Sequence, residues 1–204
     1  MTDCFALLNE ARRPWIEPEA LRQKFLALSA QAHPDRVHNA GDAAKSAAQE
    51  NYAELNVAYN RLREPKERLQ HLLELETGAK PSQVQRIPDD LMDLSQGVAV
   101  ICREADGLIA QKNRTTSPML QVQFFERGEE SAEKLRGLQR QLNAKLEFLT
   151  SELKRVDAEW ESSENRIDAG RHSLLPRLEE LWRLFSYFAR WSAQVQERLV
   201  QLSL

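Results

Sequence analysis

The strongest constraint on the fold is a long stripe of large apolar residues in the second half of the chain. They recur at steps of three or four residues from Leu135 to Trp160, through Leu138, Leu142, Leu146, Leu149, Leu153 and Val156. This spacing places all of them along one side of a helix about 38 Å long, in the pattern of a coiled-coil seam. Because such a helix cannot bury its stripe alone, other helices of the chain must cover it.

Stripes of the same helical period run through the rest of the chain. One runs from Leu91 to Leu108, and another from Leu181 to Leu202, after a polar turn around residues 168–170. No stretch shows the sustained alternation and β-branched residues that predict strands. We therefore predict an all-α fold in which residues 89–204 form a three-helix bundle with a long coiled-coil-like hairpin.

The first 78 residues predict a separate helical domain. Prolines delimit its helices, since proline fits the first helical turn and disfavours helical geometry in the residue before it. We expect helices over 3–10, 18–33, 42–63 and 65–78. Residues 79–88 carry two prolines and no helical stripe, so they are the predicted linker between a domain over 1–78 and the bundle over 89–204.

Composition excludes several classes of function. The 204 residues carry a net charge of only −3 with both signs mixed, which predicts no nucleic-acid partner. No apolar run approaches the roughly 18 to 20 residues of a membrane span. The charged N-terminus does not resemble a secretory signal. We therefore expect a cytoplasmic protein with no membrane partner.

The sequence also predicts no catalytic residues, no cofactor and no metal site. It contains no Gly-rich phosphate loop and no GxSxG, CxxC or HExxH motif, so we do not expect an enzyme. The two cysteines, Cys4 and Cys102, are too few and too far apart for a structural zinc site, and we expect both in the core. His33 and His38 with Asp35 form a poor ligand set because Pro34 interrupts the backbone between them.

One short motif gains meaning from its position. His33-Pro34-Asp35 lies in the polar connection between two helices whose apolar stripes can face each other: Leu21, Phe25 and Leu28 on one, and Tyr52, Leu55, Tyr59 and Leu62 on the other. Together with Phe5, Leu7 and Leu8, this constellation resembles the J-domain co-chaperones over Phe5 to about Gly78. A helical hairpin with a coincidental turn is the alternative.

A second resemblance is narrower. The stretch from Leu62 to Leu75, with Pro65, Arg68 and the pair Leu72-Leu73, resembles the HscB group of J-domain proteins, in which the J-domain precedes a three-helix bundle. This resemblance implies a co-chaperone that stimulates the ATPase of a DnaK/HscA-type chaperone and delivers a client, the iron-sulfur cluster scaffold protein.

The resemblance also implies which residues contact each partner. His33, Pro34 and Asp35 would dock on the ATPase chaperone, with Arg22, Lys24 and Arg36 as orienting charges. A solvated helix face is the alternative interpretation of Arg22 and Lys24. J-domains generally carry cations where this chain has Leu26 and Ala27.

The client site is the least specific part of the prediction. Leu91 and Met92 match a Leu-Met pair that follows the linker in the HscB group and contacts the scaffold, but plain bundle core explains them equally well. Two other functions stay open: a J-domain protein with a different client, and a structural protein that self-associates through the Leu135 to Trp160 stripe.

Overall fold

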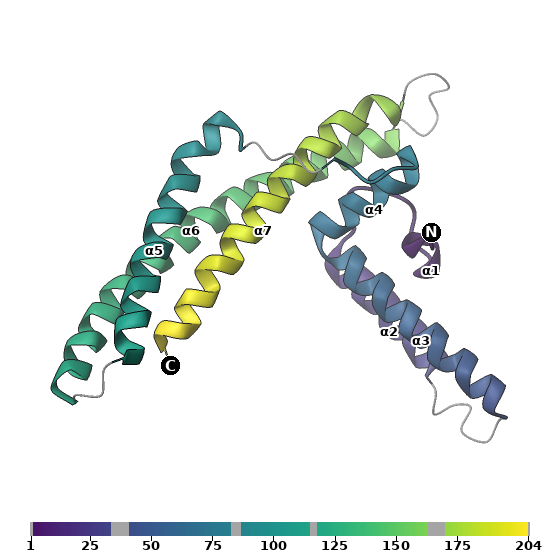
Figure 1. Cartoon of the computed structure of the whole chain (residues 1–204). Helices are drawn as coiled ribbons and strands as arrows, with labels where there is room; N and C mark the ends of the chain where they lie inside the picture. Colours follow the sequence, from purple (N-terminus) through teal and green to yellow (C-terminus); the bar gives the residue numbers. More distant parts are fainter. Residues whose placement is uncertain (1, 34–40, 83–86, 115–117, 163–169, 204) are drawn as a thin grey trace. The chain divides into compact units, whose positions relative to one another are not determined.

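We describe the fold from a computed structural model of the chain, which covers residues 2–33, 41–82, 87–114, 118–162 and 170–203 and only the backbone of 118–122. Within these ranges all regular structure is helical, with seven α-helices and two short 3-10 helices and no strand (Figure 1). The predicted all-α fold class is confirmed.

The first helix is shorter than predicted. α1 spans Cys4–Leu7 rather than residues 3–10. The Asp3 carboxylate caps it by accepting hydrogen bonds from the amides of Phe5 and Ala6. At its other end Asn9 takes a left-handed backbone conformation with φ of 51°, which turns the chain out of the helix.

The next three helices begin and end where the prolines and glycines predict. α2 spans Pro18–Ala32, α3 spans Asp42–Arg63 and α4 spans Pro65–Thr77. Pro18 and Pro65 occupy the first turns of α2 and α4. Gly78 ends α4 with φ of 73°, the left-handed conformation that glycine adopts without a steric penalty.

Three longer helices follow. α5 spans Met92–Arg114 after the 3-10 turn η2 at Asp89–Leu91, α6 spans Pro118–Ser162, and α7 spans Leu175–Ser203 after the 3-10 turn η3 at His172–Leu174. The predicted stripe of α6 is buried apart from the half-buried Leu146. The turn predicted around residues 168–170 lies mostly outside the described residues.

The chain divides into two compact units. The first contains Met1–Ser82 and Ser151–Trp182, and the second contains Gln83–Thr150 and Arg183–Leu204. The first unit therefore combines α1 to α4 with the end of α6 and the start of α7. The predicted linker at 79–88 lies partly outside the described residues, and the predicted domain limits stay predictions.

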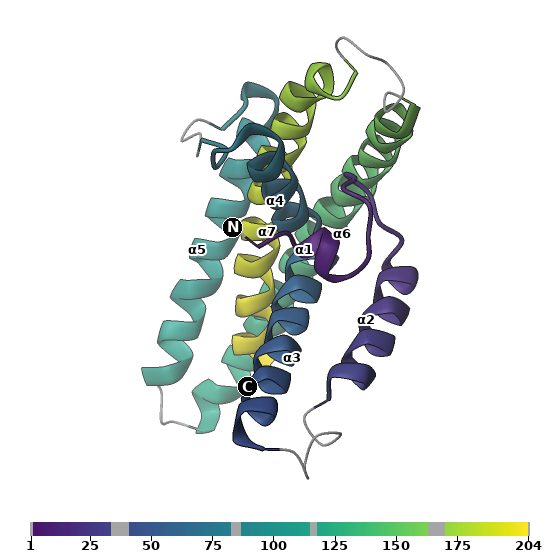
Figure 2. The same ribbon diagram turned by 90° about the vertical axis from the view of Figure 1, so that its right-hand side faces the viewer.

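Each unit has its own apolar core. In the first unit the core includes buried residues of α1, α3 and α4, among them Cys4, Phe5, Leu62 and Leu72. In the second unit α5 lies beside α6 and α7 (Figures 1 and 2), and its buried side chains include Val98, Cys102 and Ala105. Both cysteines are buried and free, as predicted.

Candidate functional site

The end of α2 presents the first residue of the predicted docking motif. His33 follows the last helical residue, has extended backbone angles and is exposed. Its ring lies edge-on to Tyr52 of α3, with 5.5 Å between the ring centroids. Pro34, Asp35 and Arg36 lie outside the described residues, as does His38.

Aromatic packing fixes the hairpin that carries His33. Phe25 of α2 stacks on Tyr59 of α3, with ring centroids 4.3 Å apart and planes within 12°. Leu21 and Leu55 are buried below them. The apolar stripes predicted for these two helices thus face each other, and offset aromatic pairs of this kind add to the area that they bury.

The two described cations of the predicted docking face differ in their surroundings. The Arg22 side chain is 60% exposed and lies 3.6 Å from Glu19, one turn earlier. Lys24 is held by Glu10 at 2.8 Å and also donates to the backbone carbonyl of Asn9. Lys24 is therefore anchored to the N-terminal segment, whereas Arg22 projects into solvent.

Apolar side chains interrupt this face. Leu26 is 49% exposed, and Ala27 beside it is also exposed. Across the hairpin, Val57 of α3 is 63% exposed. The outer surface of the hairpin is therefore a mixture of isolated charges and small apolar groups rather than a continuous basic patch.

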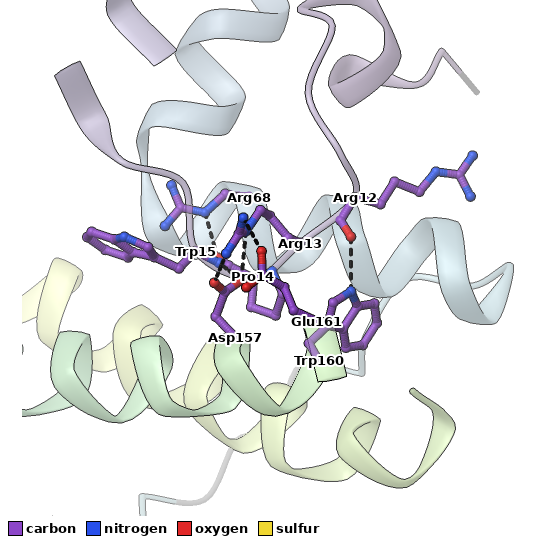
Figure 3. A network of polar contacts seen from close by, with 8 residues as sticks. All are labelled: Arg12, Arg13, Pro14, Trp15, Arg68, Asp157, Trp160 and Glu161. Carbon is purple, nitrogen blue, oxygen red and sulfur yellow. Dashed lines mark hydrogen bonds and ion pairs between the residues drawn. The ribbon is translucent and has the colours of Figure 1, made fainter. Parts of the chain in front are cut away.

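A polar network anchors the other end of the first unit (Figure 3). The buried carboxylate of Asp157 on α6 accepts hydrogen bonds from the Arg13 guanidinium and from the backbone amide of Trp15 at 2.9 Å. Trp160 is fully buried and donates its indole N–H to the carbonyl of Arg12 at 3.0 Å. The segment between α1 and α2 is thus bound to the end of α6.

Arg68 of α4 extends this network. Its guanidinium donates to the carbonyl of Pro14 at 2.8 Å and to that of Leu62 at 2.6 Å, and it lies 5.5 Å from the Trp15 ring centroid. Burial lowers the pKa of Arg68 to about 10, which leaves it charged at neutral pH. Arg68 is therefore a structural cation of the interior and not part of a surface patch.

A buried histidine links α4 to α1. The amide of Cys4 donates to Nε2 of His71 at 3.0 Å, and the His71 ring stacks on Phe5. Burial lowers the pKa of His71, and burial also raises the pKa of the Cys4 thiol. Both groups favour their neutral forms, which suits a structural contact better than nucleophilic chemistry.

The two predicted client residues, at the start of α5, differ in exposure. Leu91 is 6% exposed and belongs to the core of the second unit, whereas Met92 is 47% exposed. Of the two, Met92 therefore presents a large part of its side chain to a partner and Leu91 does not.

No ligand set for a metal emerges from the described ranges: they hold no group of three His, Cys, Asp or Glu side chains placed to bind an ion. The helices in these ranges include none that is long and apolar enough to cross a membrane.

The sequence did not predict the polar network of Figure 3. Its members lie at positions 12 to 15, 68 and 157 to 161, and no local pattern relates these three segments. The sequence places Trp160 only at the end of the apolar stripe of the long helix. A buried tryptophan N–H needs a hydrogen-bond acceptor, and this was the one signal that a polar partner lies nearby.

Comparison with known proteins identifies relatives of part of the chain. No protein-family profile matches the chain. The "Co-chaperone protein HscB homolog" of Cupriavidus taiwanensis is 38% identical over 73 residues, which are 36% of this chain and 42% of the relative. The protein of the same name from Paraburkholderia phymatum is 38% identical over 71 residues, 35% of this chain and 41% of the relative. The match thus spans about two fifths of each relative's length.

Solved structures extend the likeness of fold to the whole chain. The chaperone HscB from Vibrio cholerae has a TM-score of 0.62 at 17% identity, covering 98% of this chain and 99% of that one. Human co-chaperone protein HscB has a TM-score of 0.57 at 16% identity, covering 97% of this chain and 82% of that one. The chain is HscB-like in fold throughout and in sequence over about a third of its length.

Proposed function

We propose that this HscB-like chain is a J-domain co-chaperone of the cytoplasm that stimulates the ATPase of a DnaK/HscA-type chaperone. The observation that carries the proposal is the sequence match to HscB co-chaperones over 73 residues. The described hairpin supports it, because the exposed His33 directly follows α2 and its ring lies against Tyr52 of α3. The chain itself performs no bond chemistry in this role.

The proposed mechanism is a shift of population in the partner. Contacts from His33, Pro34 and Asp35 stabilise the ATP-hydrolysing arrangement of the chaperone more than its other arrangement. The stacked Phe25 and Tyr59 rings hold α2 against α3, so these two helices lose little conformational entropy on docking.

The proposed electrostatic contribution is small. Of the two described cations of the set, Arg22 is the more exposed and forms only a loose contact with Glu19, whereas Lys24 is bonded to Glu10 and Asn9. Arg22, Lys24 and Arg36 are proposed to orient the encounter with an acidic surface of the chaperone, mainly by raising the association rate.

An ATPase assay tests the docking role. In single-turnover hydrolysis by a DnaK-type chaperone, the intact chain accelerates the reaction and the His33→Gln and Asp35→Asn variants do not. His172→Gln is the matched control, because His172 is also exposed but lies in η3, far along the chain. Full stimulation by His33→Gln, or none by the intact chain, contradicts the proposal.

We further propose that the chain delivers a client, the iron-sulfur cluster scaffold protein, and that Leu91 and Met92 contribute to its binding. Met92 supports this more directly because of its exposure; Leu91 would act by positioning the start of α5. Met92→Ala is expected to weaken scaffold binding about tenfold with an unchanged melting temperature.

Val100→Ala is the matched control for Met92→Ala, since Val100 is 42% exposed on the same helix. Titration of the scaffold into the intact chain and both variants measures the effect. No scaffold binding by the unmutated chain, together with normal ATPase stimulation, favours a J-domain protein with a different client.

A structural protein that self-associates through the stripe of α6 is the remaining candidate. The stripe is almost entirely buried within the chain, with Leu135, Leu142 and Leu153 fully covered, which argues against its use between molecules.

A further inference from the structure

A groove of about 970 Å³ lies between α5 and α6 in the second unit. Its floor and walls are mainly apolar, with Leu94 and Ile101 from α5 and Leu138 and Ala144 from α6. Phe148 stands at one end of it and is 61% exposed. An apolar hollow beside an exposed aromatic ring is a common feature of a docking surface.

Two glycines widen the groove. Gly97 lies in the second turn of α5 and Gly137 near the middle of α6, and glycine inside a helix is unfavourable relative to alanine. No heavy atom lies within 4 Å of the position that a Cβ of Gly97 would take, so packing inside the chain does not require glycine there. The missing side chain instead leaves room for a partner.

The charges on the two walls have opposite signs. The register of the antiparallel pair is set by Lys134 beside Glu104 and by Arg127 beside Gln111. Counting along both helices from these pairs places Asp93 of α5 level with Lys145 of α6. Within the described part of the chain, neither Asp93 nor Lys145 forms an ion pair or a hydrogen bond. One wall therefore offers an unpaired anion and the other an unpaired cation.

We propose that this groove binds one amphipathic α-helix of a protein partner, which completes a four-helix arrangement with α5, α6 and α7. The partner helix has apolar residues at every third or fourth position, a basic residue on the flank along α5 opposite Asp93, and an acidic residue on the flank along α6 opposite Lys145. The lining from Asp90 of η2 to Ile101 of α5 extends about 17 Å, enough for about three turns of a partner helix.

A single helix fits this surface better than a second copy of the chain. Two concave grooves laid face to face leave their floors out of contact, whereas the ridge of one helix reaches the floor. The groove is also distinct from the proposed client residue Met92. Gly97 lies five positions after Met92, which places the two residues about 140° apart around α5.

The test uses a labelled synthetic helical peptide of about 14 residues with a leucine stripe, arginines on one flank and glutamates on the other. Fluorescence anisotropy with the intact chain measures its binding. Gly97→Leu fills the groove and is expected to weaken binding at least tenfold while the melting temperature holds or rises. Gly107→Leu is the matched control, because Gly107 also lies in α5 with open space around it and does not line the groove.

A second peptide with glutamates on both flanks tests the charges. The unmutated chain is expected to prefer the mixed peptide by about two- to fivefold, and Asp93→Lys is expected to reverse this preference. Unchanged binding to Gly97→Leu, or no binding of either peptide to the unmutated chain, overturns the proposal. Light scattering tests for a second copy of the chain in the groove. A concentration-dependent dimer that becomes monomeric in Gly97→Leu also overturns the proposal.

Discussion

Helices α2 and α4 are similar in length but opposite in the way they use their side chains. α2 has 15 residues and buries only Leu21 and Ser29. α4 has 13 residues and buries six of them: Arg68, Leu69, His71, Leu72, Leu73 and Glu74. α2 thus keeps most of its surface for solvent or a partner, whereas α4 holds the first unit together.

The polar residues of the two helices show the difference most clearly. The arginine of α2, Arg22, forms one loose contact with a neighbouring turn, whereas the arginine of α4, Arg68, binds two backbone carbonyls in the interior. The same residue type therefore serves as a surface charge in one helix and as a core contact in the other. Burial decides which changes affect stability and which affect only binding.

The largest expected effect is the loss of Arg68. We expect Arg68→Ala to lower the free energy of unfolding by roughly 3 to 5 kcal/mol, because it removes two buried hydrogen bonds from a charged donor and leaves both carbonyls without that donor. Arg22→Ala on α2 is expected to change it by less than about 0.5 kcal/mol. Urea denaturation of both variants measures the contrast, and equal effects would refute it.

A smaller loss is expected at Asp157. Asp157→Asn keeps an oxygen that can accept from the Trp15 amide but removes the charge that binds Arg13, so we expect a cost of about 1 to 3 kcal/mol. Hydrogen bonding to Asp157 also raises the pKa of Arg13, in keeping with a favourable contact. Thermal melts monitored by circular dichroism provide the measurement.

Glu161→Gln is the control for Asp157→Asn. Glu161 pairs with the same Arg13, but its side chain is 58% exposed, and exposed ion pairs contribute little. A destabilisation by Glu161→Gln as large as that by Asp157→Asn would show that burial is not what gives Asp157 its importance.

Protonation of His71 at low pH is expected to lower the free energy of unfolding by about 1 kcal/mol. Because the pKa of His71 is lowered in the folded chain, the unfolded chain binds the proton more readily. Stability contributed by neutral His71 is therefore full above about pH 6.5 and decreases as the pH falls below it. The loss is about the size of one hydrogen bond, since a proton on Nε2 displaces the bond from the Cys4 amide.

Melting temperatures between pH 8 and pH 5 measure this effect. The decline is expected to be flatter in His71→Gln, whatever the overall stability of that variant, and unchanged in His172→Gln. The pKa of Asp3 is also lowered, but its influence falls below pH 4 and outside this range. An identical decline in His71→Gln would disprove the role of His71.

The smallest effect on stability, less than about 0.5 kcal/mol, is expected from new charges on α2. Leu26→Lys with Ala27→Lys changes only exposed positions, so the melting temperature stays the same. If the exposed face of α2 meets an acidic partner, these lysines raise the association rate with a DnaK-type chaperone. The gain becomes smaller as the salt concentration rises, because the Debye length falls to about 8 Å near 0.15 M. A rate that does not respond to either change contradicts the electrostatic part of the proposed function.

Most of the helices could be predicted from the sequence because their signals are local. Pro18, Pro65 and Gly78 mark helix ends through their own backbone preferences, and the spacing of the leucines in α6 defines its buried side. The short α1 was the exception. Its end depends on the left-handed turn at Asn9, and asparagine favours that conformation without requiring it.

The candidate site could be predicted only in part from the sequence. The position of His33 at the end of α2 follows from Pro34, which disfavours helical geometry in the residue before it. That Lys24 is bonded to Glu10 and Asn9 does not follow, because the contact joins α2 to the non-helical segment after α1. The sequence also does not show which of Leu91 and Met92 is buried. This depends on the residue at which η2 ends and α5 begins.

The sequence by itself therefore determined the all-α class, the helix ends set by proline and glycine, and the apolar side of each long helix, since these depend on residues within a few turns of one another. The tertiary structure alone decided that Arg68 points into the interior, that residues 12–15 are bound by Asp157 and Trp160, and that a groove lies open at Gly97 and Gly137. Each of these depends on which polar group or empty space a distant segment brings alongside, and no local periodicity carries that information.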